Sequence, residues 1–143
     1  MMPRTIHRVA DHLDVAPAIV AELRAICLRL PEAYEERAWA GTRWMIRKRN
    51  FAHVLAIDAG WPLAYARAAH SDGPITVLTF RAGDLDLDVL THAGHPYFKP
   101  VWFRDIVGMI LDADVDWTAV AELVTDSYCT MAPKKLAATV RSG

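Results

Sequence analysis

Residues 115–136 read VDWTAVAELVTDSYCTMAPKKL, and this stretch decides the fold class. Asp116 is a good N-cap, because its carboxylate can accept backbone N–H groups of a first helical turn. Apolar side chains then recur at spacings of three and four, which places them on one face of a helix: Trp117, Val120, Ala121, Val124 and Tyr128. Pro133 ends this helix or starts a last short one. The chain therefore closes with a helix that packs on a core.

A second amphipathic helix is predicted near the start of the chain. Asp14 is its candidate cap, and Pro17 is tolerated in a first turn. Apolar residues follow at helical spacing until Pro31 ends the helix: Ile19, Leu23, Ile26, Cys27 and Leu30. Residues 1–13 are interpreted as a lead-in, either a short helix or an extended arm.

Between these helices the hydrophobic period becomes alternating, as in strands. Strands are predicted at residues 34–39, 43–47, 51–57, 75–80 and 101–111. Trp44 and Ile46 point to one face and their charged neighbours to the other, which indicates an antiparallel sheet covered on one side. Arg49-Asn50 is the predicted turn of a hairpin with a cationic tip.

Two segments are less regular. Residues 60–74 are interpreted as a connection that ends in the turn signal Ser71-Asp72-Gly73-Pro74. Residues 84–90 alternate like a strand, yet their leucines and flanking acids suit helical turns, and a short helix is favoured. The order helix, strands, helix predicts an α+β class with an antiparallel sheet, and the length of the chain fits one domain over residues 1–143.

Composition limits the classes of function. Hydrophobic residues make up 53% of the chain and charged residues 23%, which is typical of a globular domain. No apolar run approaches the roughly 18 residues of a membrane span, and no signal peptide is recognisable, so a cytoplasmic protein without membrane contact is expected. Cys27 and Cys129 are expected to be reduced thiols. The net charge of −1 provides no global field for polyanions, so nucleic-acid binding would need a local patch.

Several short motifs together resemble one known family. They are Leu30-Pro31-Glu32, Trp39 before a Gly, Phe51-Ala52, His95-Pro96-Tyr97-Phe98, Trp102, Val115-Asp116-Trp117, Asp126-Ser127-Tyr128 and Ala132-Pro133-Lys134-Lys135-Leu136. On these residues the chain resembles the MmcQ/YjbR family over nearly its whole length. The resemblance implies a fold similar to frataxin (CyaY-like), with the N-terminal and C-terminal helices packed on one face of an antiparallel sheet. It also implies a DNA-binding function without an established reaction. The hairpin tip departs from the family pattern, because Lys48-Arg49-Asn50 stands where Gly-Lys is expected, and this leaves the turn type open.

The hairpin carries the main signal for nucleic-acid binding. Five cations lie between Glu36 and Asp58 without an intervening carboxylate: Arg37, Arg43, Arg47, Lys48 and Arg49. Such a cluster can track phosphates, and the nearby Trp39, Trp44 and Phe51 would stack on bases if they were exposed. The ordinary alternative is a solvated sheet face over core aromatics. The predicted DNA-binding residues are Arg43, Arg47, Lys48, Arg49, Lys134 and Lys135.

A small molecule is the alternative partner. The aromatic residues near turns are numerous, and such residues line ligand pockets. The predicted pocket consists of Trp39, Tyr97, Trp102 and Tyr128. Ordinary core packing is the competing interpretation of all four.

Signals for catalysis and for metal binding are weak. The sequence has no G-x-S-x-G elbow, P-loop, dinucleotide fingerprint or paired-cysteine zinc pattern. Ser127 and Cys129 are the candidate nucleophiles, and the ordinary alternative for Ser127 is a bond to a carbonyl one turn back in its helix. His92 and His95 with Asp88 form a poor metal motif, and no metal and no cofactor are expected. The favoured hypothesis is a non-enzymatic DNA-binding module.

Overall fold

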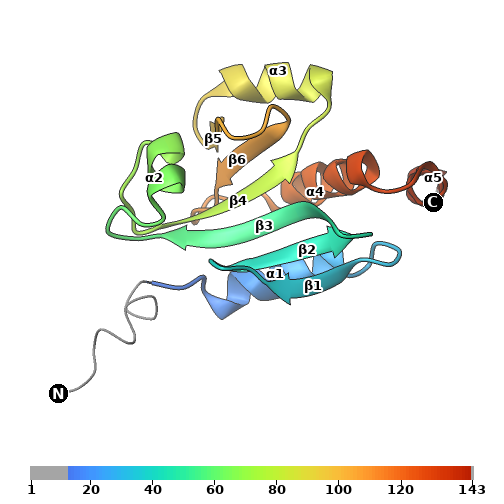
Figure 1. Ribbon diagram of the computed structural model, residues 1–143, viewed down its shortest axis with the longest axis horizontal. Coiled ribbons are helices and arrows are strands. Elements are labelled where there is room, and N and C mark those ends of the chain that lie inside the picture. The colour runs from blue at the N-terminus through green and yellow to red at the C-terminus, as the bar shows by residue number, and fades with distance from the viewer. Residues whose placement is uncertain (1–12, 143) are drawn as a thin grey trace.

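The computed structural model describes residues 13–142, which form one six-stranded antiparallel sheet with helices on both faces (Figure 1). The elements in chain order are α1 Pro17–Cys27, β1 Tyr34–Arg37, β2 Thr42–Ile46, β3 Arg49–Ile57, α2 Leu63–Ala69, β4 Ile75–Arg81, α3 Asp84–Ala93, β5 Tyr97–Phe98, β6 Ile106–Ile110, α4 Trp117–Met131 and α5 Lys134–Ser142. The sheet order is β1-β2-β3-β4-β6-β5. This architecture confirms the predicted α+β class. The predicted lead-in at residues 1–13 falls almost entirely outside the described residues.

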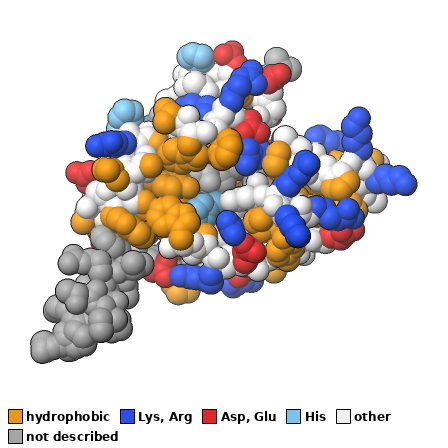
Figure 2. Space-filling model, viewed as in Figure 1, with side chains coloured by type: hydrophobic (Ala, Val, Ile, Leu, Met, Phe, Trp, Pro, Cys, Tyr) orange, Lys and Arg blue, Asp and Glu red, His pale blue; other side chains and the backbone are white. Residues whose placement is uncertain are grey.

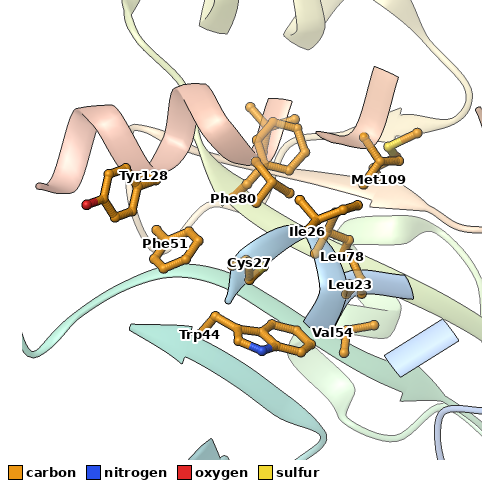
Figure 3. Packing of buried hydrophobic residues seen from close by; sticks show 14 of the residues in the cluster. Leu23, Ile26, Cys27, Trp44, Phe51, Val54, Leu78, Phe80, Met109 and Tyr128 are labelled. Carbon is orange, nitrogen blue, oxygen red and sulfur yellow. The ribbon is translucent and has the colours of Figure 1, made fainter. Parts of the chain in front are cut away.

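The main core lies between the sheet and the helices α1 and α4 (Figure 3). Leu23 of α1 and Trp44 of β2 are fully buried there, and so is Tyr128 of α4. The stripe predicted for α4 is confirmed. The predicted cap is confirmed as well, since the Asp116 Oδ1 accepts hydrogen bonds from the backbone N–H groups of Thr118 at 3.0 Å and Ala119 at 3.3 Å.

The predicted cap of α1 is wrong. The N-cap position is Ala16, which makes no side-chain capping bond, and the Asp14 carboxylate instead accepts the neighbouring Val15 N–H. Pro17 explains the tolerance for a poor cap, because proline at the first helical position has no N–H that needs a partner.

The hairpin turn lies two residues earlier than predicted. Ile46 pairs with Arg49, so the turn consists of Arg47 and Lys48, whose φ angles are 49° and 67°. These positive values are typical of a type I′ turn, which matches the twist of the flanking strands. The prediction of a turn at Arg49-Asn50 was therefore wrong.

A β-bulge explains why the alternation of apolar residues indicated the wrong position for the turn. Trp44 pairs with Ala52 and Met45 pairs with Asn50, which leaves Phe51 as an extra residue in β3. Both Phe51 and Ala52 belong to the main core. The alternation therefore breaks just after the turn, where the sequence suggests the start of a new strand.

Two connections also differ from prediction. Residues 101–103 form a loop, so the last strand is the shorter β6, and it pairs with the two-residue β5. The Ala-rich segment after Gly60 forms the helix α2, which packs on the second face of the sheet around a smaller apolar cluster: Ala40, Leu55, Ile57, Ala66 and Val77. The favoured helix over residues 84–90 is confirmed as α3.

None of the helices in the described part of the chain has both the length and the apolar character that a bilayer crossing requires.

Candidate functional site

Two basic segments that are distant in the sequence meet at one end of the molecule. The Arg49 guanidinium, which follows the β2–β3 turn, donates through Nη1 to the Met131 carbonyl oxygen at the end of α4, 3.4 Å away. Lys134 and Lys135 begin α5 directly after this point. We call Lys48, Arg49, Lys134 and Lys135 the basic end. Figure 2 shows Lys and Arg side chains gathered at the right of the molecule, where Figure 1 places the β2–β3 turn and α5.

The charge of the basic end is not compensated locally. All four side chains are exposed. Within residues 13–142, none of them forms an ion pair with a carboxylate. The turn geometry contributes to this arrangement, because a two-residue connection holds Lys48 at the tip of the hairpin, away from the sheet.

The other two predicted DNA-binding cations are paired. The Arg47 guanidinium donates through Nε and Nη2 to the two carboxylate oxygens of Glu32, at 2.7 and 3.2 Å. Arg43 donates through the same two nitrogens to one oxygen of Glu36. Their positive charges are therefore largely balanced, although both pairs are partly exposed to solvent.

The acidic partners precede the hairpin in the sequence. The hydrogen bond from Arg47 holds the pKa of the Glu32 carboxyl below its usual value, and Arg24 does the same for Glu35. Glu35 also accepts the indole N–H of Trp44 at 2.9 Å. The segment Glu32 to Glu36 was the available signal that part of the hairpin charge is neutralised by strand β1 and by the turn before it.

The aromatic residues predicted to stack on bases are mostly core. Trp44 and Phe51 are fully buried, and only Trp39 is exposed, with 66% of its surface accessible. Trp39 lies in the β1–β2 connection, at the opposite end of β2 from the basic end, where its ring packs edge-on against Trp61. The exposed site is therefore defined by charge and not by a stacking platform from these three residues.

The four residues of the predicted small-molecule pocket do not come together. Tyr128 is fully buried in the main core, and its hydroxyl donates to the Pro31 carbonyl oxygen at 2.7 Å. Tyr97 of β5 pairs with Met109 of β6, and its side chain packs against the main core, on the face of the sheet that α1 and α4 cover. Trp39 packs against Trp61 and Trp102 packs against Tyr65 of α2, both on the other face of the sheet.

Sequence reasoning missed a polar and aromatic cluster on the α2 face. The His53 ring donates through Nε2 to the Ala40 carbonyl oxygen at 2.6 Å, because a carbonyl can only accept. The His53 Nδ1 is then the acceptor that faces the Tyr65 hydroxyl at 3.4 Å, and the Tyr65 ring packs against Trp102. Burial lowers the pKa of His53 and thereby favours the neutral ring.

Ser127 has a different role from the predicted one. Its hydroxyl donates to the Phe51 carbonyl oxygen at 2.6 Å and accepts the Arg81 N–H at 2.8 Å. The last paired residues of β3 and β4 are Ala52 and Phe80, so Ser127 bridges the position where the next ladder bond would form. The prediction of a bond to its own helix was wrong.

The remaining chemical candidates are dispersed. His92 contacts Asp88, and His95 contacts Asp112 instead. Among residues 13–142, no three His, Cys, Asp or Glu side chains come together as metal binding requires. Cys27 and Cys129 are free, buried thiols whose pKa is raised by burial, which makes them poor nucleophiles.

Two solved structures and one family model resemble this chain. A protein from Deinococcus radiodurans, DR2400, described as domain family DUF419, superposes with a TM-score of 0.55 at 21% identity over 78% of this chain and 76% of that chain. A protein from Pseudomonas syringae is matched with a TM-score of 0.49 at 11% identity over 91% of this chain and 99% of its own. No curated protein matches. The family model described as YjbR matches residues 28–130, from the end of α1 to the end of α4. The chain therefore belongs to the YjbR family.

Proposed function

We propose that this YjbR-family chain is a non-enzymatic module that binds DNA through the basic end. The observation that carries the proposal is the contact between Arg49 and the Met131 carbonyl, which joins the hairpin cations to the lysines of α5. Four uncompensated cations in one place can replace the counterions of several neighbouring phosphates. The negative net charge of the whole chain orients this end toward a polyanion and the rest of the surface away from it.

The proposed phosphate contacts fall into two groups, according to whether the cation already has an acidic partner. Lys48, Arg49, Lys134 and Lys135 are the primary phosphate contacts, because no carboxylate has to be displaced. Arg43 and Arg47 are secondary contacts, since each would have to share its guanidinium with a glutamate. Contacts of this kind fix position on a backbone and read little sequence.

The test is fluorescence anisotropy with labelled single-stranded and duplex DNA at several salt concentrations. With four phosphate contacts, log K is expected to fall with log salt at a slope of about −3.6 on duplex DNA, since each contact contributes about −0.9. Neutralising the site in K48A/R49A/K134A/K135A is expected to remove nearly all of this dependence.

The matched control uses cations elsewhere on the surface. Arg29 and Arg67 are exposed and lie outside the basic end, so R29A/R67A is expected to bind almost as the wild type does. The proposal is wrong if no DNA is bound at low salt, or if R29A/R67A weakens binding as much per charge as the quadruple variant.

The second candidate function is binding of an apolar small molecule on the α2 face. It is supported by the exposed Trp39 and by the packed rings of Tyr65 and Trp102. Figure 2 shows hydrophobic side chains gathered in the region where Figure 1 places α2. Such binding would be nearly independent of salt, which separates it from the DNA proposal.

Cytoplasmic location is also part of the proposal, and the two free thiols suit a reducing compartment.

A further inference from the structure

A groove between α3 and α4 is separate from the basic end and from the α2 face. Its volume is about 680 Å³, within the range of small-molecule sites. Apolar side chains from three elements form its floor: Leu90 of α3, Tyr97 of β5 and Leu123 of α4. Leu90 is buried and the other two are half-buried, so the floor is fixed by the main core.

Three carboxylates surround this apolar floor. Asp86 lies in the first turn of α3, and Glu122 and Asp126 lie on α4 across the groove. All three are exposed, and no Lys, Arg or His is among the described residues that line the groove. Within the described range 13–142, none of them forms an ion pair, whereas Glu32, Glu35 and Glu36 each have an arginine partner.

The spacing on α4 is unfavourable for the isolated protein. Glu122 and Asp126 are four residues apart, so they are neighbours on the helix surface, about 6 Å apart along its axis. Like charges at this spacing repel and destabilise a helix. A bound cation would relieve this repulsion. The groove therefore favours positively charged ligands because of its own carboxylates.

The shape of the site selects among cations. No group of three acidic or other metal-binding side chains within residues 13–142 is close enough to hold one metal ion. A single compact ion would therefore satisfy only part of the rim. An extended cation reaches more of it, and its methylene groups would cover the apolar floor that a hydrated metal ion leaves exposed.

We propose that the α3–α4 groove binds an alkyl polyamine, with ammonium groups at Glu122, Asp126 and Asp86 and with the alkyl chain over Leu90 and Leu123. The half-buried Tyr97 ring offers a further contact to an ammonium group through its face. This site is independent of the proposed DNA function, because it shares no residue with the basic end.

The test is isothermal titration calorimetry of the full chain with spermidine at low salt. Wild-type protein is expected to bind spermidine at least about tenfold more tightly than butylamine, which has one ammonium group. E122Q/D126N is expected to weaken spermidine binding about tenfold, because two exposed charge contacts are lost. The same variant is expected to melt at an equal or slightly higher temperature than the wild type, since the repulsion within α4 is removed.

A control of equal charge separates the groove from the general acidity of the surface. Glu22 and Asp114 are exposed and lie outside the groove, so E22Q/D114N is expected to bind spermidine as the wild type does. Equal loss in both double variants would overturn the proposal, as would displacement of spermidine by Mg²⁺ at matched concentration. Binding of a lysine-rich peptide at the groove without any binding of spermidine would also overturn it.

Discussion

Replacing Ser127 with alanine is expected to lower the free energy of unfolding by about 2 to 3 kcal/mol. The side chain is fully buried, and its hydroxyl satisfies both the Phe51 carbonyl and the Arg81 N–H. Leaving a buried polar group without a partner costs about 1 to 3 kcal/mol, and two groups are affected. Two effects reduce the loss: alanine is the better helix former by about 0.5 kcal/mol, and a cavity of about 20 Å³ beside Phe51 and Arg81 can hold one water molecule.

The assay is equilibrium unfolding in urea, followed by far-UV circular dichroism and by tryptophan fluorescence. The control is T130A in the same helix, where the exposed hydroxyl bonds only the Asp126 carbonyl. That change is expected to stay within about 0.5 kcal/mol of the wild type. A loss below about 0.5 kcal/mol in S127A would show that the hydroxyl does not connect β3, β4 and α4 in the way described.

Two further predictions concern the turns and the pH dependence. G41A is expected to destabilise the protein by more than about 3 kcal/mol in urea unfolding, because φ is +77° and an added Cβ would collide with a backbone carbonyl; G83A has open space around it and is expected to stay within about 1 kcal/mol. His53 is buried and its folded-state pKa is lowered, so the unfolded chain binds a proton that the folded chain does not. Stability is therefore fully present above the unfolded pKa of about 6.5 and falls by up to about 1.4 kcal/mol per pH unit as the pH drops toward the folded pKa. Unfolding curves between pH 7.5 and 5, compared with those of H53Q, measure this slope, and an unchanged slope in H53Q would contradict the assignment.

The parts of the fold that sequence predicted are those set by local chemistry. The helix α4 follows from one capping aspartate and from side chains repeated at three and four residues, and the structure uses both. The strand β4 follows from consecutive β-branched and aromatic residues. In each case the deciding residues lie within one element, so no knowledge of the rest of the chain is needed.

Apart from the cap of α1, the errors arose where the deciding partners are distant in the sequence. Phe51 is an extra residue in the pairing of β3 with β2, and its carbonyl oxygen accepts the hydroxyl of Ser127 in α4. The hairpin sequence alone does not reveal these contacts, and the turn was therefore predicted two residues after its actual position at Arg47 and Lys48. The helix α2 is only seven residues long and is stabilised by packing on the second sheet face, which its own composition does not reveal.

The candidate site was predicted only in part for the same reason. Five of the six predicted cations are exposed and Arg43 is half-buried. Which of them are free of an acidic partner depends on Glu32 and Glu36, which strand pairing and the preceding turn bring beside Arg47 and Arg43. The α3–α4 groove was missed entirely, since its acids come from two helices, and Asp86 precedes Glu122 by 36 positions in the sequence.

The edges of the sheet have a consequence for how copies of this chain meet. One outer strand, β1, carries Glu35, Glu36 and Arg37 in a run of four residues, and the other, β5, has only two residues. Exposed strand edges recruit further strands when they are long and apolar, and charge or shortness prevents this. Neither border of this sheet is therefore a good template for strand addition. Concentrated solutions are expected to resist the edge-to-edge stacking through which antiparallel sheets aggregate.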